Sequence, residues 1–167
     1  MVTSVPMPEP SNATHELRPR AATWTHVALR VRDIDASIHW YEEHTPLRLL
    51  DKRSDEFGYG AWLGQPEMAE QPFILVLAEF FPESDPYRDV PTDILAPFAH
   101  IGIELPTQEA VDEAARVAEA SGSLTLPPQW LPPPVGYVCM VADPDGNNVE
   151  FSFDQGVYET ARRVWGS

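Results

Sequence analysis

The 167-residue sequence predicts an α+β fold of two βαβββ modules, and three observations lead to this prediction. An apolar, β-rich run with a histidine as its third residue occurs twice, as WTHVALRV (24–31) and FAHIGIEL (98–105). Each run is followed by a helical pattern, and each helical pattern is followed by three strand-like runs. Because one such sheet cannot bury its own face, we expect the two copies to pack beside each other.

The first module is predicted over residues 23–80. Alternating apolar residues make its opening run a strand, and Asp33 is a good N-cap for a helix over residues 34–44. Pro46 ends that helix. The three strand-like runs that follow are LRLLDKR, FGYGAWLG and PFILVLAEF.

The second module is predicted over residues 97–154, after a Pro- and Asp-rich connector at 81–96. Thr107 caps a helix over residues 108–121, and Gly122 is typical of the residue that ends one. Its strand-like runs are SLTLPPQWL, YVCMVAD and NVEFSF. The inner side of the helix is expected to carry Ala110, Val111, Ala114, Ala115, Val117 and Ala118.

The two ends of the chain lie outside the repeat. Residues 1–22 have the composition of a disordered leader, and residues 155–167 contain a helical pattern suited to a lid, an interface or packing on its own domain. No stretch is apolar enough for a secretory signal or a membrane span, so we expect a cytoplasmic protein without a membrane partner. The single cysteine, Cys139, agrees with a reducing compartment.

The charge balance argues against nucleic acid as a partner. The chain has 11 basic and 26 acidic residues, a formal net charge of −15. Such a chain repels a phosphate backbone and has no basic stripe to offset the repulsion.

Three polar residues within the strands indicate a site. His26 and His100 occupy equivalent positions of the two modules, so the repeat places them opposite each other, with the small residues Ala28 and Gly102 beside them on the same faces. Glu150 lies in the middle of an apolar strand, where a carboxylate is costly unless it is paired or metal-bound. A lone glutamate in such a strand more often points to solvent or to an arginine.

The segments THVALRVRDIDASIHWYE, FAHIGIEL and ADPDGNNVEF resemble the vicinal oxygen chelate superfamily, the group of glyoxalases, bleomycin resistance proteins and extradiol dioxygenases. The resemblance spans residues 23–154, and the ending DPDGN-x-x-E is its most specific part. It implies that the paired modules form a cupped mixed sheet around a divalent metal, and that the protein is a homodimer. Whether the two modules of one site come from one chain or from two is left open.

The resemblance implies His26, His100 and Glu150 as the metal ligands. Two imidazoles and one carboxylate form a facial triad, which suits Fe(II) first, with Mn(II), Co(II), Ni(II) or Zn(II) as other occupants. Many glyoxalase-type members have a fourth ligand, a glutamate of the first module at the position equivalent to Glu150. Counting from His26 by the spacing between His100 and Glu150 gives Val76, so this chain has no carboxylate at that position. Glu79, the nearest acid, has the opposite parity and should face away.

The open coordination sites favour a small, anionic, chelating substrate. Extradiol dioxygenases carry a tyrosine three residues before the Asp-Pro, and this chain has Met140 at that position. The reaction type, dioxygenase, isomerase or lyase, is therefore left open. Glu104 is the candidate base on the metal face. Arg30, at the position that matches Glu104, either pairs with Glu104 or binds a substrate carboxylate.

Aromatic side chains provide the remaining candidates for substrate contact. Tyr59, Trp62 and Trp130 are candidates for the mouth of a pocket, although aromatic residues in strands more often belong to the core or the sheet surface. The alternative function is that of a non-catalytic, drug-sequestering protein of the bleomycin resistance type. The complete triad favours the enzyme.

Overall fold

The computed structural model describes residues 22–166, so the expected leader lies almost wholly outside the described residues. The first module consists of β1 (His26–Arg30), α1 (Ile34–His44), β2 (Arg48–Ser54), β3 (Gly58–Gly64), the short 3-10 helix η2 (Pro66–Met68) and β4 (Ile74–Phe80). The second consists of β5 (His100–Glu104), α2 (Gln108–Ser121), β6 (Leu124–Leu131), β7 (Gly136–Ala142) and β8 (Asn148–Phe153), and α3 (Val157–Trp165) follows. Within the described residues, no helix is long and apolar enough to cross a membrane.

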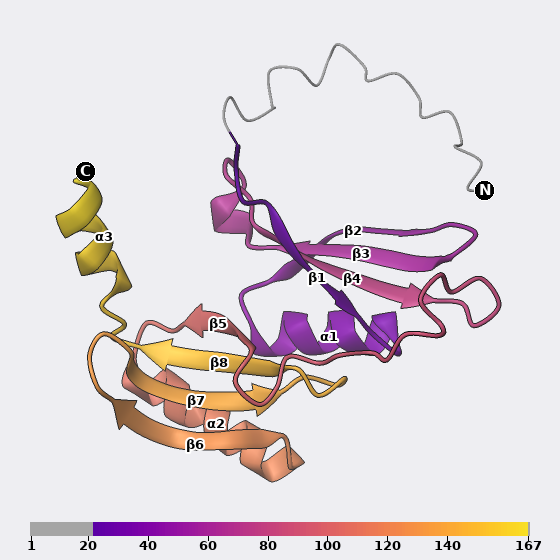
Figure 1. The fold of residues 1–167 in the computed structure, drawn as a ribbon. Coiled ribbons are helices and arrows are strands. Elements are labelled where there is room, and N and C mark those ends of the chain that lie inside the picture. Colours follow the sequence, from indigo (N-terminus) through magenta and orange to yellow (C-terminus); the bar gives the residue numbers. More distant parts are fainter. Residues whose placement is uncertain (1–21, 167) are drawn as a thin grey trace.

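Each module forms its own four-stranded mixed sheet, which confirms the predicted fold class (Figure 1). The strand orders are β1-β4-β3-β2 and β5-β8-β7-β6, and the only parallel pairs among these described strands are β1 with β4 and β5 with β8. The registers of the two parallel pairs are the same. Ala28 lies opposite Val76 in the first sheet, and Gly102 lies opposite Glu150 in the second.

The helices begin where their capping residues predict. The Asp33 carboxylate accepts a hydrogen bond from the backbone N–H of Ala36 at 2.9 Å, and the Thr107 hydroxyl accepts one from that of Ala110 at 3.2 Å. Helix α2 ends at Gly122, whose φ of 76° suits a residue without a side chain.

Each helix covers one face of its own sheet, and the two apolar layers belong to one core. Helix α1 buries Ile34, Ile38 and Tyr41. Helix α2 buries Val111, Ala115 and Ala118, whereas Val117, which was expected on the inner side, is 37% exposed. The opposite face of each sheet, called the helix-free face below, carries His26 in the first module and His100 in the second.

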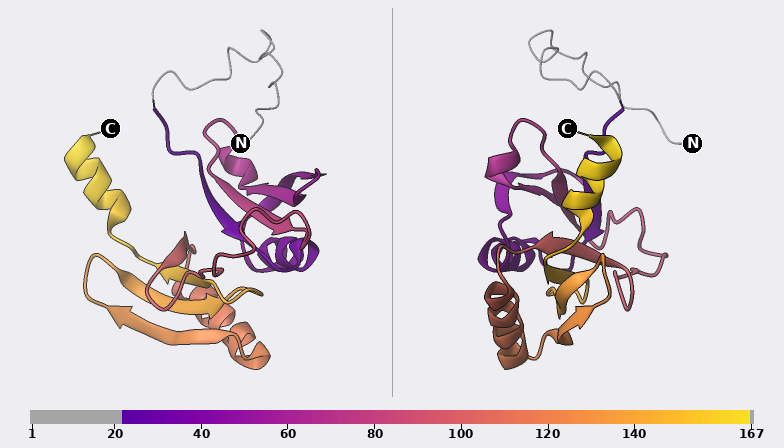
Figure 2. Two further views of the ribbon diagram at one scale, coloured as in Figure 1. Left: turned by 45° about the vertical axis from the view of Figure 1, so that its right-hand side comes forward. Right: turned by 90° about the vertical axis from the view of Figure 1, so that its left-hand side faces the viewer.

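The two modules are held together by the turn between β7 and β8. The buried Tyr41 hydroxyl of α1 donates to Asp143 at 2.8 Å, and Arg32 and Ser37 contact Asp145 of the same turn. Burial and the neighbouring Asp143 raise the pKa of Tyr41, so its hydroxyl remains a donor. In contrast, α3 stands clear of both sheets (Figure 2).

Candidate metal centre

Two of the three predicted ligands lie together on the helix-free face of the second sheet. Strand β5 supplies His100 and the neighbouring parallel strand β8 supplies Glu150. The Nε2 atom of His100 is 3.7 Å from Oε2 of Glu150, and the Glu150 side chain is only 7% exposed. The expectation that Glu150 needs a partner is therefore met within one chain.

The hydrogen bonds of both residues direct one donor atom of each toward the other. His100 Nδ1 lies 2.6 Å from the backbone carbonyl of Phe98. Because a carbonyl only accepts, Nδ1 carries a proton, and Nε2 is the ring nitrogen that faces Glu150 and could ligate a metal ion. Gln155 Nε2 donates to Glu150 Oε1 at 2.9 Å, so Oε2 is the oxygen that remains available.

His26 lies apart from this pair. It opens β1 in the first sheet, where it is exposed and where its Nδ1 is 2.9 Å from the Thr25 hydroxyl. Across residues 22–166 of one chain, no three His, Cys, Asp or Glu side chains come close enough to hold a metal ion. One copy therefore brings together His100 and Glu150 and leaves His26 on the other sheet.

The strand register confirms that Val76 is the equivalent of Glu150. Val76 lies opposite Ala28 as Glu150 lies opposite Gly102. Glu79 faces the other side of the first sheet, as its parity predicted. Its carboxylate accepts a hydrogen bond from the backbone N–H of Ile34 at 2.8 Å, at the start of α1.

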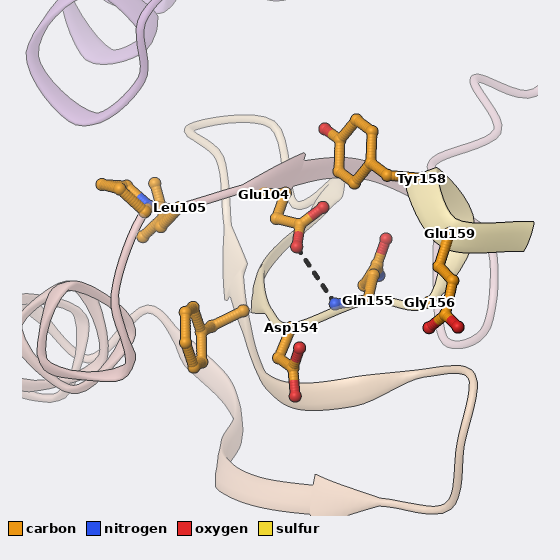
Figure 3. A pocket seen from close by; sticks show the side chains of 9 residues that line it. Glu104, Leu105, Asp154, Gln155, Gly156, Tyr158 and Glu159 are labelled. Carbon is orange, nitrogen blue, oxygen red and sulfur yellow. Dashed lines mark hydrogen bonds between the residues drawn. The ribbon is translucent and has the colours of Figure 1, made fainter. Parts of the chain in front are cut away.

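Glu104 lies on the same face as His100, at the far end of β5. Its Oε1 accepts a hydrogen bond from the backbone N–H of Gln155 at 3.0 Å, and its Oε2 is buried without a hydrogen-bond partner among the described residues (Figure 3). A cavity of about 570 Å³ opens beside Glu104, and Asp154, Gln155 and Tyr158 also line it. A buried carboxylate oxygen without a donor is suited to receive a proton or a hydrogen bond from a ligand.

Arg30 does not pair with Glu104 in one chain, so the predicted pairing is wrong there. Its guanidinium instead forms an ion pair with Asp85 of the connector and donates to the Tyr87 carbonyl at 3.3 Å. The reason is that β1 and β5 belong to separate sheets, whereas the connector folds back over the end of β1. A cavity of about 360 Å³ lies between Arg30 and the connector.

The three aromatic candidates divide between the sheet faces. Trp62 lies opposite Val76 and therefore on the helix-free face, with the Arg53 guanidinium 4.6 Å from its ring centre. Tyr59 lies opposite Glu79, and Trp130 lies opposite Tyr137, whose hydroxyl reaches Asp112 of α2. Both are on the helix side of their sheets, so of the three only Trp62 shares the helix-free face of its sheet with His26.

Sequence reasoning missed two features of the site. Gln155 follows β8 through a bend at Asp154, whose φ of 61° is unusual for a residue with a side chain, and no periodic pattern indicates it. No sequence pattern indicated that Asp143 of the DPDGN segment links the two modules. In the structure its Asp143 accepts hydrogen bonds from the backbone of Asp145 and Asn147 and binds α1, which is a structural role.

A family profile described as the Glyoxalase/Bleomycin resistance protein/Dioxygenase superfamily matches residues 23–151. An uncharacterized protein of Pseudomonas aeruginosa, PA2024, is 41% identical over 133 residues, which cover 80% of this chain and 89% of that protein.

Two solved structures of low identity share the fold. A fosfomycin resistance protein of Listeria monocytogenes, FosX, solved with Mn(II) and 1S,2S-dihydroxypropylphosphonic acid, is 16% identical with a TM-score of 0.58 and covers 84% of this chain and 98% of its own. The antibiotic binding protein TnmS3 of a Streptomyces species is 18% identical with a TM-score of 0.54 and covers 81% of this chain and 98% of its own.

Proposed function

Because the chain belongs to the Glyoxalase/Bleomycin resistance protein/Dioxygenase superfamily, we propose that it is a metal-dependent enzyme acting on a small oxygenated organic substrate. In this proposal, His100 and Glu150 of one copy and His26 of a second copy hold one divalent cation. The observation that carries it is the 3.7 Å separation between His100 Nε2 and Glu150 Oε2.

The donor atoms fit a divalent cation. Nitrogen and oxygen ligands bind such ions at ~2.0 to 2.2 Å, so two donors of one ion lie at most ~4.4 Å apart. The pair meets this limit, and each side chain has its other polar atom held by a hydrogen bond, as metal-ligating residues usually have. Among the described residues, no arginine or lysine pairs with the buried Glu150 carboxylate, and a bound cation would supply a full positive charge beside it.

The third ligand is proposed to come from a second copy because, within residues 22–166, the edge strands β1 and β5 are unpaired on one side. A twofold dimer that brings β1 of one copy beside β5 of the other covers both edges. The same dimer places His26 of each copy opposite His100 of its partner and forms two sites.

Ligand preference favours Fe(II) for this donor set, with Mn(II), Co(II), Ni(II) or Zn(II) as other occupants. The Mn(II) in the FosX structure supports a first-row divalent ion in a protein of this fold. When bound, the cation supplies Lewis acidity or, as Fe(II), the ability to activate dioxygen.

The chain's own residues define the substrate. Val76 adds no carboxylate beside His26, so the three ligands leave about one positive charge uncompensated and favour an anionic substrate with two neighbouring oxygens. Glu104, with its unpartnered Oε2, is the proposed base that removes or returns a proton. Trp62 is proposed to form an apolar wall, and Arg30 to border it with positive charge.

Hybrid dimers test both the site and its division between copies. His26→Ala and Glu150→Ala chains, each expected to bind no metal tightly, are co-expressed with different tags and purified as a mixed dimer. If the site joins two copies, one of the two sites in the mixed dimer is intact and binds one Mn(II) per dimer. A site within one chain leaves both sites of the mixed dimer defective.

Reaction type is tested on the Fe(II)-loaded wild type under controlled oxygen. Catechols, enediolates and 2-keto acids are added as chelating anions, and optical bands and oxygen uptake are followed together. Bands with oxygen consumption support a dioxygenase, whereas bands without consumption support an isomerase or lyase. If none of these anions produces optical bands or oxygen uptake, the proposed substrate class is wrong.

The second candidate function is the sequestering of a small molecule without catalysis. It is favoured by the presence of only two ligands together among the described residues of one copy and by the shared fold of an antibiotic binding protein. Purification without chelator followed by elemental analysis separates the two functions. Ligand binding that is unchanged by EDTA, in a protein that holds no metal, supports the sequestering function.

A further inference from the structure

Helix α3 makes almost no use of its apolar side chains in a single copy. None of its nine residues is buried, and Trp165 is 82% exposed. Figures 1 and 2 show α3 projecting from the end of β8, clear of both sheets. An isolated helix of this length is marginal in water, because most helical stability in proteins comes from packing an apolar face.

The apolar residues of α3 form one stripe with a basic border. The stripe follows helical spacing, and Arg162 and Arg163 are exposed beside it in a chain whose formal net charge is −15. Its members are Val157, Tyr158, Ala161, Val164 and Trp165.

A complementary surface, called the Trp24 patch below, lies where β1 and β4 begin. The rings of Trp24 and Phe73 are 6.1 Å apart, and Trp24 is 79% exposed. Met68 of η2, in the segment that leads from β3 to the start of β4, is exposed. Glu67 and Glu70, on the segment that leads to Phe73, are exposed and give the patch an acidic border.

We propose that α3 packs on the Trp24 patch of a second copy. The inference rests on the proposed function, because it uses the twofold dimer that joins His26 to His100 and Glu150. In this dimer, the two modules that share a site are copies of one pattern, and we place them about an approximate twofold axis perpendicular to the strands. With His26 opposite His100, β5 then runs antiparallel to β1 of the second copy, and its Glu104 end lies beyond His26, on the side of Trp24. Helix α3 starts four residues after the end of β8, at that same end. The apolar surfaces and the opposite charges then face each other.

A second copy fits better than the helix's own module. The backbone N–H of Gly156 donates to the Pro134 carbonyl at 2.9 Å, which ties the start of α3 to the loop between β6 and β7. From there α3 projects clear of both sheets of its own chain (Figure 1). Tyr158 and Glu159 of its first turn line the 570 Å³ cavity together with Glu104, so docking of α3 on a second copy would fix one wall of this cavity (Figure 3). Dimerisation therefore completes the metal site and also fixes one wall beside the proposed base.

Sedimentation equilibrium tests the contact. Val164→Glu places a charge in the stripe and should weaken dimerisation about 30-fold, the effect of losing a well-packed interface residue. Arg163→Ala changes the net charge by the same amount but leaves the stripe intact, so it should weaken dimerisation far less. Replacing Glu67 and Glu70 by Lys should weaken the dimer, and adding Arg162→Glu to that variant should restore part of the loss.

Thiol cross-linking identifies the occupant. One tagged chain carries Trp165→Cys, the other carries Trp24→Cys, and a short bismaleimide is added to the mixed dimer. A covalent product that contains both tags supports docking between copies. As a control, one chain carries both substitutions. A cross-link that forms only within that chain overturns the docking but leaves the proposed function standing. The same holds if no cross-link forms while the dimer and its Mn(II) binding persist. A monomeric wild type that binds no Mn(II) overturns both.

Discussion

The two modules share one backbone pattern and differ in the chemistry of the face on which the site is built. Each position in β5 and β8 is 74 residues after its equivalent in β1 and β4, as the registers of the two parallel pairs show. Histidine stands at the first position in both modules. Val76 replaces the carboxylate of Glu150, and Arg30 stands where the second module has Glu104.

The difference extends to the residues that support the ligands. Gln155, which holds Glu150, corresponds to Phe81 in the first module, where no carboxylate needs a donor. Both modules thus keep the histidine, and they differ at the positions of the carboxylate and of the residue that holds it. The second module supplies Glu150 and the Gln155 that orients it, whereas the first module has Val76 at the equivalent position. A symmetric scaffold thus carries an asymmetric candidate site.

Glu150→Ala is expected to have the largest effect, because it removes the only charged ligand of the proposed site. Affinity for Mn(II), measured by calorimetry, should fall by more than ~100-fold, beyond the loss typical of an outer-shell residue. Thermal unfolding should change little, since losing a buried, incompletely paired charge offsets the lost contacts. Val76→Ala, the matched change in the first module, should leave Mn(II) affinity almost unaltered.

Gln155→Leu is expected to weaken Mn(II) binding by about 10- to 100-fold. The substitution frees Glu150 Oε1, so the carboxylate is no longer held with Oε2 toward His100. Phe81→Leu tests the equivalent position of the first module and should have no effect on affinity. Equal effects of the two substitutions would indicate that Gln155 acts only through packing.

Tyr41→Phe tests the hydrogen-bonded link between α1 and the β7–β8 turn of the second module. Loss of the buried hydrogen bond to Asp143 should lower the free energy of unfolding by about 1–2 kcal/mol. Tyr137→Phe removes a hydrogen bond to Asp112 within the second module and should cost less than ~1 kcal/mol. Urea titrations of the three proteins provide the comparison.

The Tyr41 effect should also depend on pH. Burial and Asp143 raise the pKa of Tyr41 above its ordinary value of 10.0, so the folded state holds this proton more tightly than the unfolded state. The resulting stabilisation is fully present below about pH 10 and is lost as the pH rises further. The stability gap between wild type and Tyr41→Phe should therefore narrow above pH 10. A gap that widens there would contradict the assignment.

Much of the fold follows from local signals. Alternation fixes the strand faces, Asp33 and Thr107 fix the helix starts, and the repeat fixes the equivalence of Val76 and Glu150. The pairing of His100 with Glu150 was accessible because both lie on neighbouring parallel strands, where register decides proximity.

The remaining features depend on contacts between segments that no local pattern links. Arg30 meets Asp85 because the connector folds over β1, and Tyr41 meets Asp143 because the modules pack in one particular way. Gln155 reaches Glu150 through a left-handed bend at Asp154, a conformation for which glycine or asparagine is the usual signal. Tertiary packing, rather than propensity, determines these positions.

Val76→Glu should have the smallest effect and tests why the first module lacks a carboxylate. Val76 faces the same side of the sheet as His26, opposite Ala28, so a glutamate there can reach the ion held by His26. A fourth ligand occupies one coordination position and cancels about one positive charge, so the cation should bind more tightly and a chelating anion about fivefold more weakly. Val76→Gln, of nearly the same size but uncharged, should change anion affinity much less. Titration of a catechol or 2-keto acid into the Mn(II)-loaded proteins measures the difference in anion affinity. Equal anion affinity in wild type and Val76→Glu would show that the uncharged side chain at position 76 does not select the substrate's charge.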